Sequence, residues 1–350
     1  IVLGALERGK PVVTANKALL AECANEIFPK VYETGLALGM EASVAGGIPV
    51  LRSLKEGLSG DRILESSGIV NGTCNYILTR MTDEGAESEE VLADAQRLGY
   101  AEADPAFDVG GFDAAHKLAV LVNLAYGGIV DFKQIHVEGI RGLTPMDLMF
   151  ADQLGYTVKL LAIGKMNDGL IEARVHPTLV ESTHLLASVN GVFNAVFLTG
   201  DNVDATMSYG RGAGGAPTAS AVVSDVLDIA RNLRAGIRMK IPVLNVMQDQ
   251  VKQLTLQSMD EIICEYYLRF QVLDQPGVLA GITRVFGEHS ISIRSMIQPD
   301  QEEIADAPVQ VILTTHAAKE ANVQKALQEI AGFDFIQADT QLIRIERLAG

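Results

Sequence analysis

Apolar residues recur at helical and at strand spacing in successive blocks of this chain, and together they predict an α/β body followed by a smaller α/β unit. Segment 1–40 begins as the end of a helix, continues as a strand at Val12–Val13, and then has helical spacing that Pro29 interrupts. Strand patterns dominate between about 157 and 200, which indicates a sheet with an antiparallel part. A glycine-rich stretch then leads into a long amphipathic helix at 216–233.

The last segment, 264–347, follows a simpler plan. A strand, a helix, two strands, a second helix and a final strand succeed one another, which is the split βαβ order of a ferredoxin-like unit. The polar residues around 244–260 predict a linker before it. We therefore expect this unit to have its own core, so that its removal leaves the body's chemistry intact.

Composition excludes several classes of function. The formal net charge is −16, from 28 basic and 44 acidic side chains, so the surface repels polyphosphate and a nucleic-acid partner is not expected. No apolar run approaches the length of a membrane span. The cysteines form no CxxC pair and the histidines no HxH or HxxxH pair, which favours reduced thiols and gives no transition-metal site. We expect a cytoplasmic protein.

The densest group of ionisable residues lies at 95–117, AQRLGYAEADPAFDVGGFDAAHK. Asp113 and Lys117 stand four apart on a predicted helix and so share one face. Lys117 precedes the apolar run 118–122, and a partly buried lysine needs a carboxylate beside it. From the residues alone, this pair is either a surface ion pair of small energetic value or part of a functional site.

The spacing of this stretch, A-x3-G-Y-x3-D-P-x2-D-V-x-G-x-D-x3-K, resembles the signature of homoserine dehydrogenases. Three further stretches resemble the same family: VVTANKALLA at 12–21, EASVAGGIP at 41–49 and GRGAGGAPTASAVVSD at 210–225. Near the end, LDQPGVLAGI and ISIRSMIQ resemble an ACT regulatory domain. The resemblance extends from 1 to 347.

The resemblance implies an α/β fold in three parts. Residues 1–40 correspond to the remainder of a Rossmann-type dinucleotide-binding domain, to which helix 216–233 returns. Residues 41–215 correspond to an α/β catalytic and dimerisation domain, and 264–347 to a ferredoxin-like ACT domain. These enzymes begin with a strand and a glycine-rich phosphate loop, and neither precedes Ile1, so we expect residues upstream of it.

A literal G-x-G-x-x-G occurs at Gly210, Gly212 and Gly215, but its context differs from that of a dinucleotide loop. The preceding residues, 206–208, give no buried strand run. Any contact with the cofactor is therefore expected from backbone N–H groups at the start of the following helix, represented by Gly215.

By resemblance, the activity is the NAD(P)H-dependent interconversion of L-aspartate 4-semialdehyde and L-homoserine, in the biosynthesis of threonine, methionine and isoleucine. Lys117 matches the proton donor to the alkoxide that hydride addition creates, a role that an ammonium suits. Lys17 matches a second lysine beside nicotinamide and substrate. Glu102 and Asp108 match acids that orient the substrate, and Asp113 matches a further carboxylate that holds Lys117 or a water.

Segment 41–48 resembles a loop that binds a monovalent cation, most simply sodium. The resemblance implies oxygen ligands from the side chain of Glu41 and from the main-chain carbonyls of Val44, Gly46 and Ile48. Hard cations prefer such an oxygen shell. Without the resemblance, the segment reads as a tight turn.

The ACT-like segment implies a small effector, with threonine as the expected ligand, and pairing of domains in a homodimer or homotetramer. Its turn at 274–277, D-Q-P-G, offers N–H groups at a helix start that can bind a carboxylate. Two alternatives remain open. One is an amino-acid sensor whose dehydrogenase body no longer catalyses, and the other is a related dehydrogenase with a different substrate. The sequence does not choose between NAD and NADP.

Overall fold

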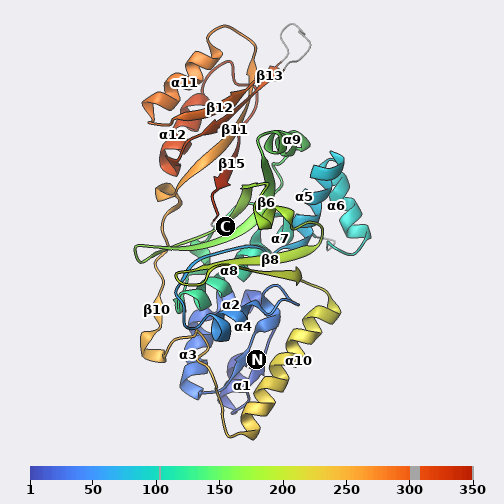
Figure 1. Ribbon diagram of the computed structural model, residues 1–350, viewed down its shortest axis with the longest axis vertical. Helices are drawn as coiled ribbons and strands as arrows, with labels where there is room; N and C mark the ends of the chain where they lie inside the picture. The colour runs from blue at the N-terminus through green and yellow to red at the C-terminus, as the bar shows by residue number, and fades with distance from the viewer. Residues whose placement is uncertain (102–103, 300–307, 349–350) are drawn as a thin grey trace.

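The computed structural model describes residues 1–101, 104–299 and 308–348. Figure 1 shows three parts along the long axis: an N-terminal α/β part, a central sheet covered by helices, and a C-terminal α/β part. Most strands of the second and third parts belong to one mixed sheet of 11 strands. The structure therefore confirms the predicted α/β fold class, with a ferredoxin-like unit at the C-terminal end.

The N-terminal part surrounds a parallel pair of short strands, β1 (Val12–Val13) and β2 (Leu38–Gly39). Its helices are α1 (Val2–Glu7), α2 (Lys17–Glu22), α3 (Ala24–Thr34) and α10 (Gly215–Arg234). Helix α10 returns to this part from far along the sequence, as predicted, and contacts β1 and β2 (Figure 1). Pro29 lies inside α3, so the expected break at this residue is wrong. The helical stretch is divided at Cys23 instead.

The central sheet carries the order β7-β6-β3-β8-β9. These strands are β3 (Ile63–Ile69), β6 (Tyr156–Asn167), β7 (Leu170–Glu181), β8 (Phe193–Gly200) and β9 (Asp204–Arg211). Neighbouring strands here are antiparallel, as the sequence pattern indicated. The last of them, β9, is a largely exposed strand that includes Gly210, so the G-x-G-x-x-G spacing begins within a strand, although not a buried one.

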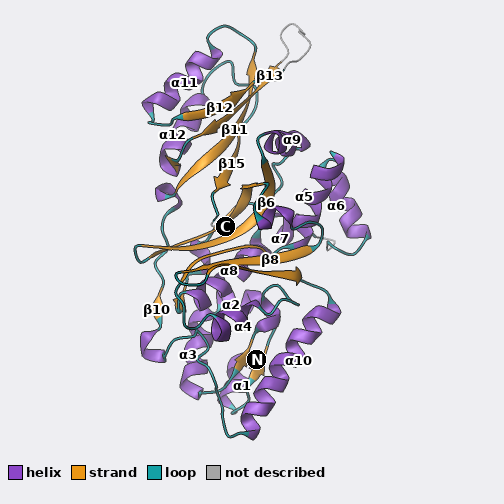
Figure 2. Cartoon of the chain, viewed as in Figure 1, coloured by secondary structure: helices purple, strands orange, loops and turns teal. Residues whose placement is uncertain are grey.

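Helices pack around this sheet (Figure 2). They are α4 (Val50–Arg52), α5 (Gly72–Glu84), α6 (Ser88–Arg97), α7 (Ala106–Val109), α8 (Phe112–Ala125) and α9 (Pro145–Gln153). Helix α8 is apolar on nearly every face, and it is buried along its length against α2, β3, β6 and β7. Such a helix can hold an ionisable side chain only with partners at hand.

The C-terminal part has the predicted βαββαβ order. Its main elements are β11 (Ile263–Leu273), α11 (Val278–Glu288), β12 (Ile293–Ile297), β13 (Pro308–Thr315), α12 (Glu320–Ile330) and β15 (Gln341–Glu346). Four short strands complete the structure: β4 (Gly128–Ile129), β5 (His136–Val137), β10 (Lys252–Gln253) and β14 (Ala318–Lys319).

The strands of the central part and those of the C-terminal part meet at β15 within this one sheet. This strand lies antiparallel to β11 on one side and parallel to β7 on the other. The C-terminal part has a core of its own, yet Tyr267, Ile312, Ile343 and Ile345 belong to the core cluster of the body. The expected separate core is therefore present, but the unit is not self-contained. The sheet and the body's hydrophobic core both continue across the junction.

Candidate active site

Lys117 is buried on α8 and held by two acceptors. Only 8% of the residue is exposed, and its Nζ donates to the Val70 carbonyl at 2.6 Å and to Asp113 Oδ2 at 2.8 Å. The two side chains are four residues apart on one helical face, as their spacing predicted. With both groups nearly excluded from water, this contact is not a solvated surface pair of small value.

Asp113 joins two lysines from different parts of the chain. Its Oδ2 accepts from Lys117, and its Oδ1 lies 3.1 Å from Lys17 Nζ at the start of α2. Burial alone would raise the pKa of Asp113, but attraction to Lys117 and Lys17 outweighs it and lowers this pKa to about 2. The carboxylate is therefore ionised at neutral pH and keeps two ammonium groups close together.

Asn71 links this carboxylate to Asp108. Its Nδ2 donates to Asp113 Oδ2 at 2.7 Å and to Asp108 Oδ1 at 2.8 Å. Its Oδ1 accepts from the backbone N–H of Cys74 at 2.8 Å, so the same side chain caps α5. One buried amide therefore fixes a helix start and orients two acids.

Strand β3 determines where these groups lie. It ends at Ile69, and the next two residues are Val70, whose carbonyl accepts from Lys117, and Asn71. The Asn-Gly pair at 71–72 therefore forms the junction between this strand and α5. Cys74 contributes a thiol that donates to the Asp108 carbonyl at 3.2 Å, and burial raises the pKa of this thiol, which therefore stays protonated.

A histidine on α8 connects this helix to α2. His116 Nε2 lies 2.8 Å from Glu22 Oε1, and the ring is stacked between Phe107 and Phe132, with centroid distances of 5.3 and 4.3 Å. His116 points away from Lys117, as expected for successive helix positions. Its contact with Glu22 helps to keep α2, and with it Lys17, against α8.

The structure thus brings together four of the residues singled out in the sequence, Lys17, Asp108, Asp113 and Lys117. Glu102 lies outside the described residues. Asn71 is not among the expected site residues, because the stretch N-G-T-C-N at 71–75 predicts a turn before a helix, which the resemblance places only at the edge of the active site. Its signal was ambiguous because an asparagine before a glycine and a helix is common in turns and caps alike.

Residues of the predicted cation segment form a second cluster, and their hydrogen-bond partners differ from those of the two lysines. Both carboxylate oxygens of Glu41 accept backbone N–H groups, from Leu51 and from Arg52, each at 2.9 Å. The side chain therefore caps the short helix α4. Burial raises the pKa of Glu41 to about 7, and the nearby charge of Asp225 adds to this rise.

Asp225 was not recognised from the sequence, where it is one acid among many on an amphipathic helix. From α10, it accepts the N–H of Glu41 at 2.9 Å and a guanidinium hydrogen bond from Arg52 at 3.2 Å. The contact ties α10 to the start of segment 41–48. Gly39 is required beside it, because a Cβ there would lie 2.7 Å from that of Asp225.

Segment 44–48 packs against the glycine-rich stretch before α10. Gly47 N–H donates to the Arg211 carbonyl at 3.0 Å, and a Cβ on Gly46 would lie 2.6 Å from the Gly212 carbonyl oxygen. The Ile48 carbonyl already accepts from Val50 N–H at 2.8 Å. Gly215 begins α10, after Gly214 at φ +111° and without a side-chain cap.

Two further observations limit the chemistry of the described residues. They contain no group of three or more His, Cys, Asp or Glu side chains arranged to hold a metal ion. Within the same ranges, no helix is both long and apolar enough to cross a membrane.

Comparison with known proteins gives consistent matches. The family profile of homoserine dehydrogenase matches residues 49–227, and that of the ACT domain matches 266–332. The homoserine dehydrogenase of Pseudomonas aeruginosa is 44% identical over 348 residues, which are 99% of this chain and 80% of that protein. That of Bacillus subtilis is 40% identical over 99% of this chain and 78% of its own length.

Solved structures agree with the sequence relatives. A homoserine dehydrogenase from Thiobacillus denitrificans is 45% identical and superposes with a TM-score of 0.93, covering 99% of this chain and 78% of that one. A hyperthermophilic archaeal homoserine dehydrogenase mutant in complex with NADPH is 30% identical, with a TM-score of 0.58 over 66% of this chain and 67% of that one.

Proposed function

This chain belongs to the homoserine dehydrogenase family, and on that premise we propose that Lys17, Asn71, Asp108, Asp113 and Lys117 form its catalytic site. The protein is an oxidoreductase that interconverts L-aspartate 4-semialdehyde and L-homoserine with a nicotinamide dinucleotide. The observation that supports this site best is the buried Lys117, held by Asp113 and the Val70 carbonyl beside a second lysine.

Lys117 is the proton donor in the direction of reduction. When bound, the reduced dinucleotide supplies a hydride to the aldehyde carbon, and negative charge develops on the aldehyde oxygen. An ammonium has three N–H bonds, and in the described part of the chain Val70 and Asp113 accept two of them. The third is available to the substrate oxygen, where the charge stabilises the alkoxide and the proton neutralises it.

Asp113 keeps this donor aimed. Its carboxylate, with a pKa of about 2, is ionised and lies within 3.1 Å of the Nζ atoms of both Lys117 and Lys17. Lys17 then adds a second positive charge close to the reacting oxygen and the nicotinamide. Two ammonium groups that share one carboxylate are held in place before substrate arrives, so little reorganisation is needed during the reaction.

Asp108 binds the ammonium group of the amino-acid substrate, together with Glu102. Asn71 donates to one oxygen of Asp108 and to Asp113, so it keeps the two carboxylates on the same side of the site. A sensor without catalysis would need acids for an amino acid but not two lysines on a buried carboxylate. This cluster therefore favours the enzyme over the sensor.

The residues present fit a dinucleotide at the start of α10. Close approach of Gly46 to Gly212 and the uncapped helix start at Gly215 leave backbone N–H groups accessible to a phosphate. An archaeal relative was solved in complex with NADPH, which supports NAD or NADP as the cofactor. Lys17 would lie on the nicotinamide side of this ligand.

A sodium ion is proposed at segment 41–48, held by the carbonyls of Val44, Gly46 and Ile48 and by the carboxylate of Glu41. Positive φ angles at Ala45 and Gly46 turn this backbone sharply, which suits convergent carbonyls. Because Glu41 also caps α4, the ion would link that helix to the stretch before α10.

Sodium or potassium should then raise activity more than an equal ionic strength of a bulky organic cation. Equal responses would argue that this segment is only a turn.

The ACT domain is proposed to bind threonine at the turn before α11. Gly277 has φ +96° and caps the helix without a side chain, so N–H groups in the first turn of this 11-residue helix can donate hydrogen bonds to a carboxylate. Pairing of two such domains in a homodimer or homotetramer would complete the site. A cytoplasmic location follows from a biosynthetic role.

The proposed function is tested by assaying the purified full-length gene product with aspartate 4-semialdehyde and each reduced dinucleotide. Oxidation of the dinucleotide that depends on the semialdehyde, with homoserine formed in equal amount, is expected. Binding of amino acids without turnover would instead favour the sensor.

A further inference from the structure

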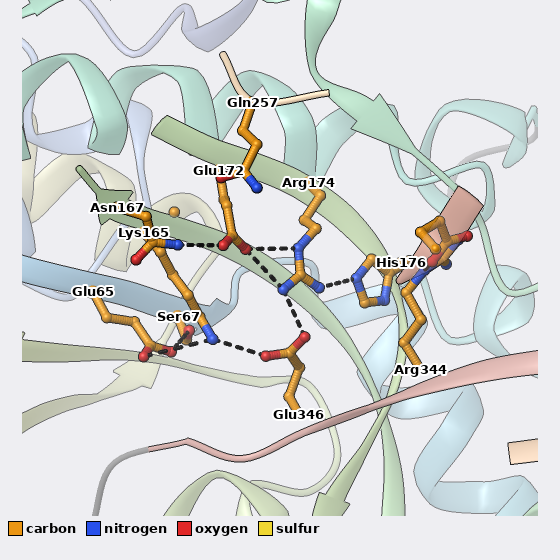
Figure 3. Close-up of polar contacts among 12 residues, drawn as sticks. Glu65, Ser67, Lys165, Asn167, Glu172, Arg174, His176, Gln257, Arg344 and Glu346 are labelled. Atoms are coloured by element: carbon orange, nitrogen blue, oxygen red, sulfur yellow. Dashed lines mark hydrogen bonds and ion pairs between the residues drawn. The ribbon is translucent and has the colours of Figure 1, made fainter. Parts of the chain in front are cut away.

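A group of five charged side chains, three of them buried and two half-buried, lies in the sheet, and the proposed reaction does not use it (Figure 3). We call it the sheet charge cluster: Glu65 on β3, Lys165 on β6, Glu172 and Arg174 on β7, and Glu346 on β15. Arg174 is 2% exposed and Glu346 is 4% exposed. Charges at this depth are costly unless each one has a partner.

The C-terminal strand supplies one necessary partner. Glu346 Oε1 lies 2.6 Å from Arg174 Nη2, and Glu346 Oε2 lies 2.8 Å from Lys165 Nζ. Burial raises the pKa of Glu346, but attraction to Arg174 and Lys165 outweighs it and brings this pKa to about 2. The carboxylate is the last residue of the ACT domain's final strand, so the ACT domain completes an ion cluster that otherwise belongs to the catalytic sheet.

Lys165 transmits this contact toward β3. In the sheet register, it is directly opposite Glu65 of β3 on one side and Glu172 of β7 on the other. Its Nζ is 3.8 Å from Glu65 but 2.8 Å from Glu346. Without the negative charge of Glu346, the ammonium would move toward Glu65 and alter the side-chain ladder on β3.

Strand β3 connects this ladder to the catalytic site. It runs from Ile63 to Ile69, and the next two residues, Val70 and Asn71, hold Lys117 and Asp113. A change in the position of β3 at Glu65 therefore reaches the proton donor along one extended strand.

We propose that Glu346 is a positioning residue for the reaction, through which the ACT domain sets the position of β3 and hence of Val70 and Asn71 around Lys117. This inference rests on the proposed role of Lys117. It also gives the ACT domain a physical route to the catalytic site, because a rotation that withdraws β15 from β7 also withdraws Glu346 from Lys165 and Arg174. Coupling between two sites requires an element with two arrangements that both sites influence, and here that element is β15.

The test uses Glu346→Gln, which keeps the shape and removes the charge. The matched control is Glu181→Gln. Glu181, the last residue of β7, forms an ion pair at 3.2 Å with Arg347, the residue after β15, and the two side chains are 49% and 52% exposed. Lys165→Met and the double variant complete a cycle. All are assayed in the full-length enzyme well below the lowest melting temperature, and hydrogen exchange of the β3 amides is measured alongside.

We expect Glu346→Gln and Lys165→Met each to lower kcat about tenfold, with KM for the semialdehyde nearly unchanged. The double variant should be no worse than the more affected single one, because both changes interrupt the same link. Protection of β3 amides should fall in Glu346→Gln and not in Glu181→Gln. If Glu346→Gln does not fold, Lys165→Met carries the same prediction for kcat and for β3.

Three outcomes would overturn the proposal. They are a kcat within twofold of the parent in both single variants, losses that multiply in the double variant, and reduced exchange protection confined to β7 and β15. A failure of the proposed function can be told apart from this. In that case Lys117→Ala would retain activity, whether or not the sheet charge cluster is intact.

Discussion

Asn71 has more influence on the site than its size suggests, because a single buried side chain caps a helix and positions two acids. Its amide uses both N–H bonds on Asp108 and Asp113, and its oxygen on the Cys74 N–H. Removal of a donor between two carboxylates leaves them to repel each other in a poorly solvated place.

Substitution of Asn71 by aspartate separates these roles. Aspartate caps a helix as well as asparagine does, so α5 should remain capped. The donor is lost and a third carboxylate is added, so kcat/KM should fall at least about tenfold. Asn71→Ser, which keeps a cap and a small donor, is the comparison. Steady-state kinetics and thermal melting check the prediction, and parental kcat/KM in Asn71→Asp would contradict it.

Asp113 should also make the free energy of unfolding depend on pH in the acid range. Its pKa is about 2 in the folded protein, below the value near 4 of an unfolded aspartate. The stabilisation is therefore complete above about pH 4 and is lost as the pH falls through about 2. Unfolding free energies measured across this range should fall more steeply for the parent than for Asp113→Asn. Parallel pH profiles would show that the carboxylate is not held by the two lysines.

At the scale of elements, the contact between segment 44–48 and the stretch before α10 depends on the lack of a side chain. Gly46 has φ +30°, and an added Cβ would meet the Gly212 backbone at 2.6 Å. Gly46→Ala should therefore destabilise the protein by about 1–3 kcal/mol and raise KM for the dinucleotide. Gly57, where a Cβ would meet nothing within 4 Å, is the control for denaturant unfolding. Equal stability of the two alanine variants would contradict this account.

Elements with strong local patterns were predictable from the sequence. The apolar periodicity of α8 and the βαββαβ order near the end depend on local alternation, and both are present. The break at Cys23 was not predictable, because Pro29 gave a stronger local signal than the packing that decides the matter. The ion pair of Lys17 with Asp113 depends on α2 lying against α8, which no local pattern encodes. From the sequence, only the family resemblance placed Lys17 and Asp113 in the same site.

At the scale of the whole molecule, the continuous sheet changes what removal of the ACT domain should do. From the sequence, we expected truncation after Asp260 to leave turnover intact. In the structure, truncation would remove Glu346 from Lys165 and Arg174 and take Tyr267 and Ile343 from the body's core. We now expect the truncated protein to be less stable and slower, as well as insensitive to threonine.

The truncated and full-length proteins should be compared by thermal melting, kcat and response to threonine. Unchanged melting and turnover would show that the shared sheet is dispensable. A threonine response that persists without the ACT domain would place the effector site elsewhere.

The central claim is that the buried ammonium of Lys117 donates the proton, and its most direct test is the kinetics of Lys117→Ala in the full-length enzyme. Lys133→Ala, at an exposed lysine, controls for loss of a positive charge. The account predicts that Lys117→Ala lowers kcat by about 10²–10⁴-fold, with a much smaller change in KM, while Lys133→Ala behaves as the parent. A folded Lys117→Ala variant whose kcat stays within about threefold of the parent would contradict it.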